Sequence, residues 1–422
     1  MADVTRHFAN VAAPLRHRNY RLFYIGQLIS LIGSWMQTVG QSWLVLGLTH
    51  SPFLLGVINA LQWTPVLLFS LPAGFVADRF PRRTVIVVTQ SVSLVLALSL
   101  GILAVGGWVQ FWHVAVLAAL LGTVNAVDVP TRQAFLVEMV GGTEDLTGAI
   151  ALNSSLFNGA RLIGPAIAGL VIAAGGVGAA FLANAASYLA VIWALAAMEV
   201  TVSAEVGPAA GLFTHIAEGV RFVRRTPSLL RLLAVVTVLS LFPLNSQLFV
   251  PVLARFRLHL EPSGFGFLLS AQGAGALLAA LFVAATSGDG PRRAYLLWGG
   301  VLLCGAILAL SAVTRVELAA IVLFLAGAGM ITFLATANST VQMTTPDALR
   351  GRITSIYTMV NNGTTPIGSL VMGGLIDAWG LTAGLLIAGA AGLAGVLGIG
   401  GTFRPTDCPT GRIDSREVAS WR

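Results

Sequence analysis

Twelve apolar runs, most of them 20 to 29 residues long, divide this chain of 422 residues. A helix needs about 20 residues to cross a hydrocarbon core roughly 30 Å thick, so each run has the length of a membrane-spanning helix. The composition agrees, because 56% of the residues are hydrophobic and only 10% are charged, which is too little polar surface for a water-soluble globule of this size. The expected helices span residues 20–48, 52–77, 84–106, 111–135, 147–173, 178–199, 229–254, 263–287, 294–314, 317–342, 353–377 and 381–402.

The basic residues indicate how these helices are oriented. All 24 basic side chains are arginines, and most of them precede the first run or fall in every second connection after it. Short cytoplasmic loops of membrane proteins are enriched in arginine, so both termini are expected in the cytoplasm and the chain is expected to pass many times through the membrane. This topology also explains the net charge of +7, so no nucleic-acid partner is expected.

The sequence also repeats itself. A shift of 210 residues places Pro52, Gly56 and Gln62 on Pro262, Gly266 and Gln272. The prediction is an all-α membrane protein with twelve transmembrane helices in two six-helix repeats. Its expected parts are a cytoplasmic tail (1–19), a first six-helix bundle (20–199), a cytoplasmic linker with an amphipathic helix (200–228), a second bundle (229–402) and a cytoplasmic tail (403–422).

A dense cluster of charged residues, within residues 74–83, lies where the second apolar run ends and before the third begins. The carboxylate of Asp78 is expected to face the positive N-terminal end of the helix that begins near Arg352, where a negative charge is stabilised by about 0.3 to 1 kcal/mol. Such a contact holds the cytoplasmic mouth between the two halves closed. The alternative is a topology anchor, which needs only the arginines. The expected gating residues are Gly74, Asp78, Arg79, Arg82 and Arg83.

This cluster, Gly-x-x-x-Asp-Arg-x-x-Arg-Arg, together with twelve helices and a long central loop, resembles the major facilitator superfamily over residues 20–402. Three short sequence segments, which begin at Leu15, Gly33 and Asp128, resemble those of a bacterial branch of this superfamily that includes enterobactin exporters and related drug-efflux proteins. The resemblance implies a transporter that works by alternating access, with a gating role for the cluster. Pro81 stands where that family usually has a glycine.

Polar residues follow one stripe of the first expected helix at spacings of three and four. Such a stripe faces protein or water rather than acyl chains, so we expect it to line a cavity. The alternative is that amide and hydroxyl groups join helices to one another. The expected cavity-lining residues are Gln27, Ser30, Ser34, Gln37 and Gln41, with Asn158, Thr358 and Asn361 from the fifth and eleventh helices.

Charges inside the apolar runs mark a second candidate site. A charge in the bilayer centre costs about 2.5 to 3.5 kcal/mol on insertion scales, so each needs a partner or a function. We expect Asp128 to pair with Arg132 or with Arg161, and protonation of the carboxylate to break the pair and couple transport to protons. The alternative is a purely structural pair at the cytoplasmic interface.

A glycine-proline segment on the fifth expected helix resembles the Gly-Pro-x-x-Gly-Gly antiporter motif, with Ala168 in place of one glycine. Small residues allow helices to approach closely, and a proline bends its helix. The segment favours export over import. Its expected motif residues are Gly164, Pro165 and Gly169.

No enzymatic site is expected. The chain has no lysine, so it lacks the Gly-x-x-x-x-Gly-Lys-Ser/Thr loop that binds ATP phosphates. No cofactor or metal is expected, and the proton gradient is the expected energy source. The substrate does not follow from the resemblance. A polar cavity without a dense ring of charges suits a neutral or mixed-charge ligand, so we expect a monomeric exporter, in a bacterial plasma (inner) membrane, of an amphipathic small molecule such as a siderophore or a drug, with the lipid bilayer and that substrate as partners. Two alternatives are a nutrient importer or facilitator on the same fold and a membrane sensor that transports nothing.

Overall fold

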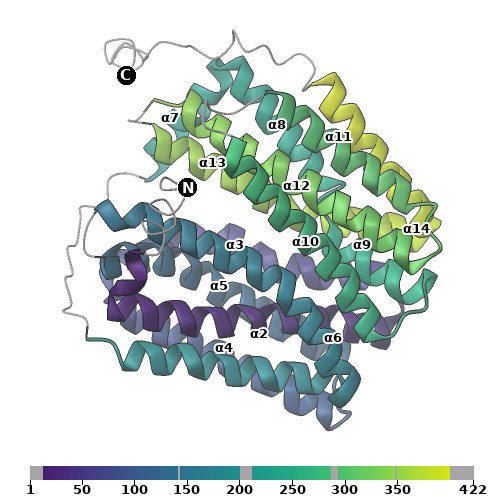
Figure 1. The fold of residues 1–422 in the computed structure, drawn as a ribbon, viewed down its shortest axis with the longest axis horizontal. Helices are drawn as coiled ribbons and strands as arrows, with labels where there is room; N and C mark the ends of the chain where they lie inside the picture. The colour runs from purple at the N-terminus through teal and green to yellow at the C-terminus, as the bar shows by residue number, and fades with distance from the viewer. Residues whose placement is uncertain (1–12, 141–142, 200–211, 287–292, 347–348, 400–422) are drawn as a thin grey trace, which may run out of the picture. The chain divides into compact units, whose positions relative to one another are not determined.

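The computed structural model describes residues 13–140, 143–199, 212–286, 293–346 and 349–399 (Figure 1). Within its helices, the side chains of residues 70–78, 140, 143–144, 147 and 212–217 lie outside the described part. The described ranges form helices joined by short connections and contain no β-strand. The all-α prediction is therefore confirmed for these ranges.

Nine stretches of the described residues are long and apolar enough to cross a membrane. The first long helix, α2 (Arg18–Thr49), is outside this set, because its polar stripe lowers its hydropathy. Large apolar side chains also face away from the neighbouring helices: Leu170, Trp193 and Trp298 are 66%, 67% and 71% exposed. Helices that are apolar on all sides are typical of a lipid environment, so the membrane prediction and the helix compositions agree.

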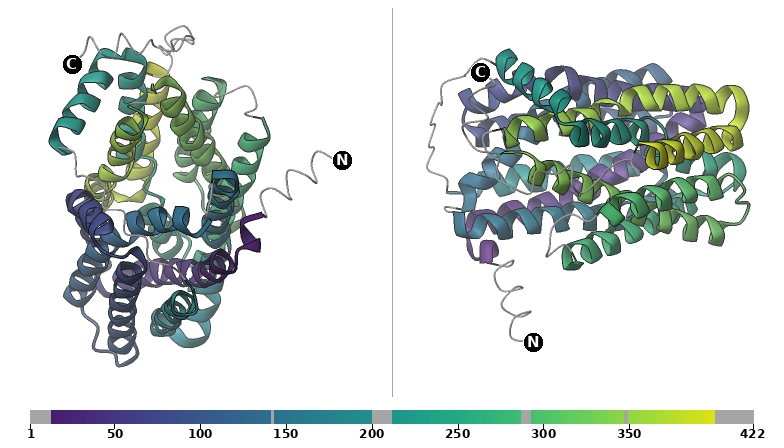
Figure 2. Two further views of the ribbon diagram at one scale, coloured as in Figure 1. Left: turned by 90° about the vertical axis from the view of Figure 1, so that its left-hand side faces the viewer. Right: turned by 90° about the horizontal axis from the view of Figure 1, so that it is seen from above.

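Contacts between residues divide the chain into two units, one from Met1–Pro208 with Val250–Gly273 and the other from Ala209–Phe249 with Ala274–Arg422. In the first unit, a short 3-10 turn, η1, precedes the long helices, which lie side by side with roughly parallel axes (Figures 1 and 2). Helix α2 packs along α6, α3 along α5, and α4 along both α5 and α6. The elements are η1 (Ala13–Arg16), α2 (Arg18–Thr49), α3 (Pro52–Arg79), α4 (Arg82–Val105), α5 (Phe111–Val140) and α6 (Thr143–Ala196).

One end of the first unit has an aromatic core. The rings of Phe23 and Phe135 meet edge to face at 6.0 Å, and both side chains are buried with Leu195. The hydroxyl of Tyr20 donates to the Ala149 carbonyl at 3.0 Å, which satisfies its polar atom in this apolar setting. This core joins the start of α2 to α5 and α6.

The second unit is built around α11, which packs on α12 and α14, while α14 also packs on α8 and α13 packs on α7. Its buried core includes Val236, Phe333 and Ile353. Helix α10 (Pro262–Thr286) and the short α9 (Ser246–Val252) each cross the boundary between the two units. The remaining helices are α7 (Leu212–Arg225), α8 (Pro227–Leu241), α11 (Arg293–Leu310), α12 (Val316–Thr344), α13 (Arg350–Gly363) and α14 (Thr365–Gly398).

Two long helices turn sharply at single glycines. In α6 the turn is at Gly176, with φ 75° and ψ 175°, and in α14 it is at Gly380, with φ 82° and ψ 163°. Glycine reaches this region of φ without the steric cost that a Cβ atom brings. The turns fall in the gaps that the sequence leaves between expected helices 147–173 and 178–199, and between 353–377 and 381–402.

The expected helix 229–254 is wrong as one continuous element. Helix α8 ends at Leu241, α9 begins at Ser246, and a π-helix, η2, spans Leu253–Arg257. The side-chain amide of Asn245 donates to the carbonyls of Ser240, Leu241 and Phe242 at 3.2, 2.9 and 3.2 Å, and Pro243 has no N–H to continue the helix. The carbonyls at the break are thus satisfied by a side chain.

The expected helix 353–377 is also divided. Helix α13 ends at Gly363 and α14 begins at Thr365, where Pro366 occupies the first turn. A proline is accepted in a first turn because that N–H has no helical partner in any case. Hydropathy alone did not reveal either break, since apolar residues resume directly after Pro243 and after Pro366.

Candidate functional site

A buried carboxylate lies between α4 and α5. The side chain of Asp128 on α5 is 1% exposed and forms an ion pair with Arg132, one helical turn later. Thr89 Oγ1 and Gln90 Nε2, both on α4, donate to Asp128 Oδ1 at 2.6 and 3.0 Å. The carboxylate therefore has one cationic partner and two hydrogen-bond donors, which is the set that a buried charge requires.

Of the two arginines that the sequence left open as partners of Asp128, Arg132 is the one whose ion pair the structure records. Arg161 lies on α6, with its guanidinium carbon 5.8 Å from the centre of the Trp35 ring. That distance is within the range of a cation–π contact. The assignment of these residues to proton coupling stays a prediction.

The polar stripe on α2 faces other helices. Gln27, Ser30, Gln37 and Gln41 are buried, with exposed fractions of 5%, 2%, 6% and 5%, while Ser34 is half-buried and donates to the Ser30 carbonyl at 2.9 Å. This burial fits the expectation that the stripe avoids lipid.

Two glutamines of the stripe pair with side chains on other helices. Asn184 Nδ2 on α6 donates to Gln37 Oε1 at 2.5 Å, and Gln41 Nε2 donates to Gln62 Oε1 on α3 at 3.1 Å. These bonds match the alternative in which amides join helices. Whether any member of the stripe also lines a transport path stays a prediction.

The other expected cavity-lining residues make mostly local contacts. Asn158 and Thr358 each donate to the carbonyl four residues earlier, at 2.9 and 3.0 Å. Asn361 accepts from the Ser240 hydroxyl at 3.3 Å, which joins α13 to α8. Thr358 is exposed and Asn158 is half-buried.

The glycine-proline segment of α6 packs closely against neighbouring helices. A Cβ atom added at Gly164 would lie 2.5 Å from Trp35 Cβ, and one added at Gly169 would lie 2.8 Å from Ser263 Cα. Similarly, a Cβ at Gly266 would lie 2.3 Å from the Pro165 carbonyl oxygen. Real Cβ atoms essentially never approach so closely, so these glycines permit close packing of α6 with α2 and with the start of α10.

The charge cluster after α3 is described only in part. Gly74 and Asp78 lie outside the residues whose side chains are described, and Arg79 is exposed. Arg82 forms an ion pair with Glu138 on α5 at 2.5 Å, and Arg83 donates to the Ala196 carbonyl at the end of α6 at 3.2 Å. These two arginines join the start of α4 to its neighbours, and their gating role stays a prediction.

A further cluster consists of an arginine and two aromatic side chains that were not among the expected site residues. Arg255 Nη1, in the π-helix η2, donates to the Trp43 carbonyl at 3.0 Å, and its guanidinium lies 4.9 Å from the Trp43 ring centre. The Trp43 ring in turn stacks on Phe265 at 5.7 Å. The sequence offered one signal for this cluster. Arg255 follows an apolar run, in a connection of the kind that has few arginines.

Among the described residues, no group of three or more His, Cys, Asp or Glu side chains is arranged to hold a metal ion.

Comparison with known proteins gives concordant matches. A family model described as "Transmembrane secretion effector" matches residues 9–409. The staphyloferrin A transporter of Staphylococcus aureus is 31% identical over 40% of this chain and 42% of its own length, so this match spans less than half of that relative. The multidrug efflux pump Tap of Mycolicibacterium fortuitum is 28% identical over 91% of this chain and 95% of its own length.

Solved structures agree on the fold. The nucleoside transporter NupG matches 92% of this chain and 99% of its own length with a TM-score of 0.74, at 12% sequence identity. At that identity the likeness concerns the fold alone.

Proposed function

This chain belongs to the transmembrane secretion effector family of the major facilitator superfamily, and from that premise we propose that it exports an amphipathic small molecule in exchange for protons. Membership makes it a membrane transporter rather than an enzyme. The proposal adds the direction, the coupling ion and the substrate class, a siderophore or a drug. It includes twelve transmembrane helices in two six-helix repeats, alternating access between the repeats, and both termini in the cytoplasm.

The observation that carries the coupling proposal is the environment of Asp128. The carboxylate is buried, paired with Arg132, and held by donors from a second helix. A proton that reaches this carboxylate removes its charge, and Arg132 is then left as a cation without its counter-ion in a region of low dielectric constant. The favoured arrangement of α4 and α5 therefore depends on whether the proton is bound, which is the property that a coupling site needs.

The direction of transport is supported by the glycine-proline segment of α6 and by the relatives. Gly164, Pro165 and Gly169 resemble the antiporter motif, and their close backbone packing suits a helix held tightly against its neighbours. One relative is named as a multidrug efflux pump. The gating role of Asp78 is part of the proposal and is to be tested by substitution.

A transport assay in everted membrane vesicles tests the proposal. The wild type is expected to accumulate a fluorescent amphipathic dye in everted vesicles only when the lumen is acidic. Asp128→Asn keeps the shape of the side chain and removes its charge, and it is expected to abolish the dependence on the gradient while the protein stays folded. The matched control is Asp145→Asn, since Asp145 pairs with His17 at 2.9 Å near the helix ends.

Four outcomes of this assay are distinguishable. Uptake that depends on the gradient in the wild type and in the control, but not in Asp128→Asn, supports proton-coupled export. Uptake by Asp128→Asn equal to that of the wild type removes Asp128 from the mechanism. Transport in the opposite direction identifies an importer or facilitator, and no transport of any dye or siderophore by a folded protein favours a sensor.

A further inference from the structure

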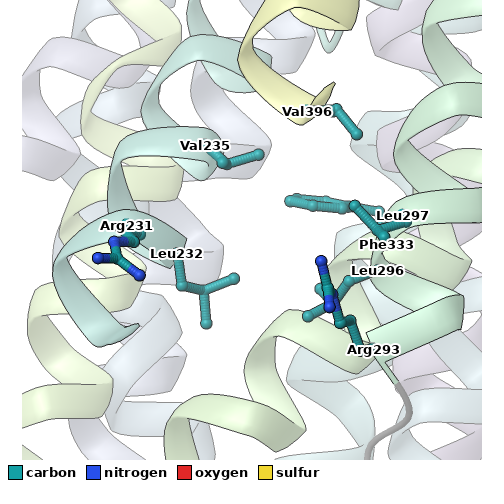
Figure 3. Close-up of a pocket in the computed structure, with 8 residues that line it drawn as sticks. All are labelled: Arg231, Leu232, Val235, Arg293, Leu296, Leu297, Phe333 and Val396. Carbon is teal, nitrogen blue, oxygen red and sulfur yellow. The ribbon is translucent and has the colours of Figure 1, made fainter. Parts of the chain in front are cut away.

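A crevice in the second unit is too small to bind a substrate. It lies between the starts of α8 and α11, and its lining includes Arg231, Leu296 and Phe333 (Figure 3). Its interior measures about 20 Å³, which is enough for one water molecule. The first unit has a site of another kind, in the polar atoms that surround the buried carboxylate of Asp128.

The two oxygens of the Asp128 carboxylate have different partners. Oδ2 faces Arg132 in the ion pair, whereas Oδ1 accepts from Thr89 and Gln90 of α4. A guanidinium has five N–H donors and no acceptor, so an acid proton on Oδ2 would point at a group that cannot receive it. A hydroxyl and an amide each contain a donor and an acceptor. The partners of Oδ1 can therefore hold this oxygen with or without a proton.

The Thr89 hydroxyl lies within reach of two acceptors. Its Oγ1 is 2.6 Å from Asp128 Oδ1 and 2.9 Å from the carbonyl oxygen of Ile86, one turn earlier on α4. A hydroxyl has one proton, so it donates to only one of these oxygens at a time. When the carboxylate is ionised, that proton is donated to Oδ1. When Oδ1 itself carries a proton, Oγ1 can donate to Ile86 and accept from the acid.

Few titratable side chains of other helices lie near this carboxylate. Tyr188 on α6 interacts with the charges of Asp128 and Arg132, and its hydroxyl accepts from Asn184 Nδ2 at 3.4 Å. Other charged side chains of these helices have partners elsewhere, namely Arg82 with Glu138, Asp145 with His17 and Arg161 beside Trp35. The helical stretches without a titratable residue are 25–49 of α2, 52–69 of α3 and 84–105 of α4.

We propose that the proton taken up by Asp128 binds Oδ1, the oxygen that faces α4, and that Thr89 is the positioning residue of this proton site. The acid hydroxyl on Oδ1 donates to Thr89 Oγ1, whose own proton turns to the Ile86 carbonyl. Nε2 of Gln90 continues to donate to Oδ1, and Oδ2 becomes a neutral carbonyl oxygen that still accepts from Arg132. The inference rests on the proposed function, in which Asp128 binds a proton.

The hydrogen bonds between α4 and α5 are thus kept when the negative charge is lost. Arg132 keeps a neutral acceptor but loses the opposite charge beside it, which is the larger part of its stabilisation in a region of low dielectric constant. The proton therefore changes the balance of charge within α5 without separating α4 from it.

Infrared difference spectroscopy of the full-length protein in lipid vesicles, between neutral and acid pH, tests which oxygen binds the proton. A protonated carboxyl group gives a carbonyl band that a carboxylate lacks, and the band of this residue is the one that Asp128→Asn removes. Donors that contact the carbonyl oxygen lower the wavenumber of the band. With the proton on Oδ1 the carbonyl oxygen is Oδ2, so Gln90→Met is expected to leave the band in place. Arg132→Lys changes the donor that faces Oδ2 and is expected to move it.

The role of Thr89 is measured on the same band. Thr89→Val removes the acceptor of the acid hydroxyl and is expected to raise the wavenumber, while Thr89→Ser keeps a hydroxyl and is expected to restore the wild-type position. The matched control is Ser91→Ala on the same helix, because the Ser91 hydroxyl donates only to the Val87 carbonyl, at 2.7 Å. Gln90→Leu serves if Gln90→Met fails to fold.

Each outcome decides for or against the site. A band that moves in Arg132→Lys and in Thr89→Val, but not in Gln90→Met or in the Ser91 control, supports it. A higher wavenumber in Gln90→Met with no change in Arg132→Lys assigns the proton to Oδ2 and overturns it, and a wild-type band in Thr89→Val overturns the role of Thr89.

These outcomes leave the proposed function intact, because each of them requires that Asp128 binds a proton. If Asp128→Asn removes no band, the carboxylate takes up no proton, and the coupling part of the proposed function fails together with this inference. The two failures are therefore distinguishable in one set of spectra.

Discussion

The hydroxyl of Thr89 on α4 donates to the carboxylate of Asp128 on α5 across 2.6 Å, so two helices share the most deeply buried acidic side chain described. Gln90 adds a second bond from the same helix at 3.0 Å. The protonation state of one carboxylate therefore affects contacts on both helices. This relationship makes the Asp128 cluster a candidate for coupling as well as for stability.

Thr89→Val removes the shared hydroxyl and leaves the shape of the side chain almost unchanged. We expect the free energy of unfolding to fall by about 1 kcal/mol, which is within the range measured for hydrogen bonds between membrane helices. Unfolding by a denaturing detergent, followed by circular dichroism, measures the change. The control is Thr123→Val, because the Thr123 hydroxyl donates only to Ala119 within its own helix. Equal losses in the two variants would contradict a special role for the bond between α4 and α5.

Gly266→Ala places a methyl group 2.3 Å from the Pro165 carbonyl oxygen. Because backbone cannot move aside as a flexible side chain can, we expect a loss of about 1 to 3 kcal/mol in the free energy of unfolding. The melting temperature of the purified protein reports it. Gly159→Ala on α6 is the control, since nothing lies within 4 Å of the added methyl group. A Gly266→Ala protein as stable as this control would show that α6 and the start of α10 are not held in close contact.

The bond between Gln37 and Asn184 is suited to a double-mutant cycle. Gln37→Leu and Asn184→Leu each remove one partner of a buried bond of 2.5 Å. We expect a coupling free energy of about 0.6 to 1.7 kcal/mol between the two positions. The control is a second cycle with substitutions at Gln37 and Gln62. Gln62 bonds to Gln41 and not to Gln37, so no coupling is expected in that cycle. A coupling near zero for Gln37 and Asn184 would favour the cavity-lining role that the sequence suggested for Gln37.

Arg255→Gln tests the cluster at the end of α2. The change removes a hydrogen bond to the Trp43 carbonyl and a cation–π contact with its ring, and we expect a loss of about 1 to 2 kcal/mol in unfolding free energy. Arg255→Lys keeps the charge but lacks the planar fork, so it should restore part of the loss. The measurement is chemical unfolding monitored by tryptophan fluorescence. Arg315→Gln, which removes an exposed arginine, should have little effect, and equal effects of the two glutamine variants would rule out a specific contact.

Much of the fold could be predicted from the sequence, because lipid imposes a strict length and composition on a spanning helix. The expected starts at residues 52, 111 and 263 lie within one residue of the observed starts of α3, α5 and α10 at Pro52, Phe111 and Pro262. The interruption of the seventh expected helix could not be predicted from hydropathy. It depends on the Asn245 side chain replacing backbone donors, and an asparagine in an apolar run has several other uses.

The candidate site was only partly predictable. Asp128 and Arg132 are one helical turn apart in sequence, so helix geometry made Arg132 one of the two expected partners, and the structure records their ion pair. The partners Thr89, Asn184 and Glu138 come from other helices, and which helices are neighbours is a property of packing rather than of local sequence. Arg255 falls outside the connections that are rich in arginine, and its neighbours in sequence do not indicate a partner. Its contact with Trp43 becomes visible once the π-helix directs it.

The single-glycine turns at Gly176 and Gly380 leave almost no connecting chain between the helical segments that they join, since helix continues on both sides of each. A protease, a bulky epitope insertion or a membrane-impermeant label directed at these turns would therefore find little to cut, displace or modify. The connection between α4 and α5 is a better position for an inserted epitope or a label, because residues 106–110 separate the two helices.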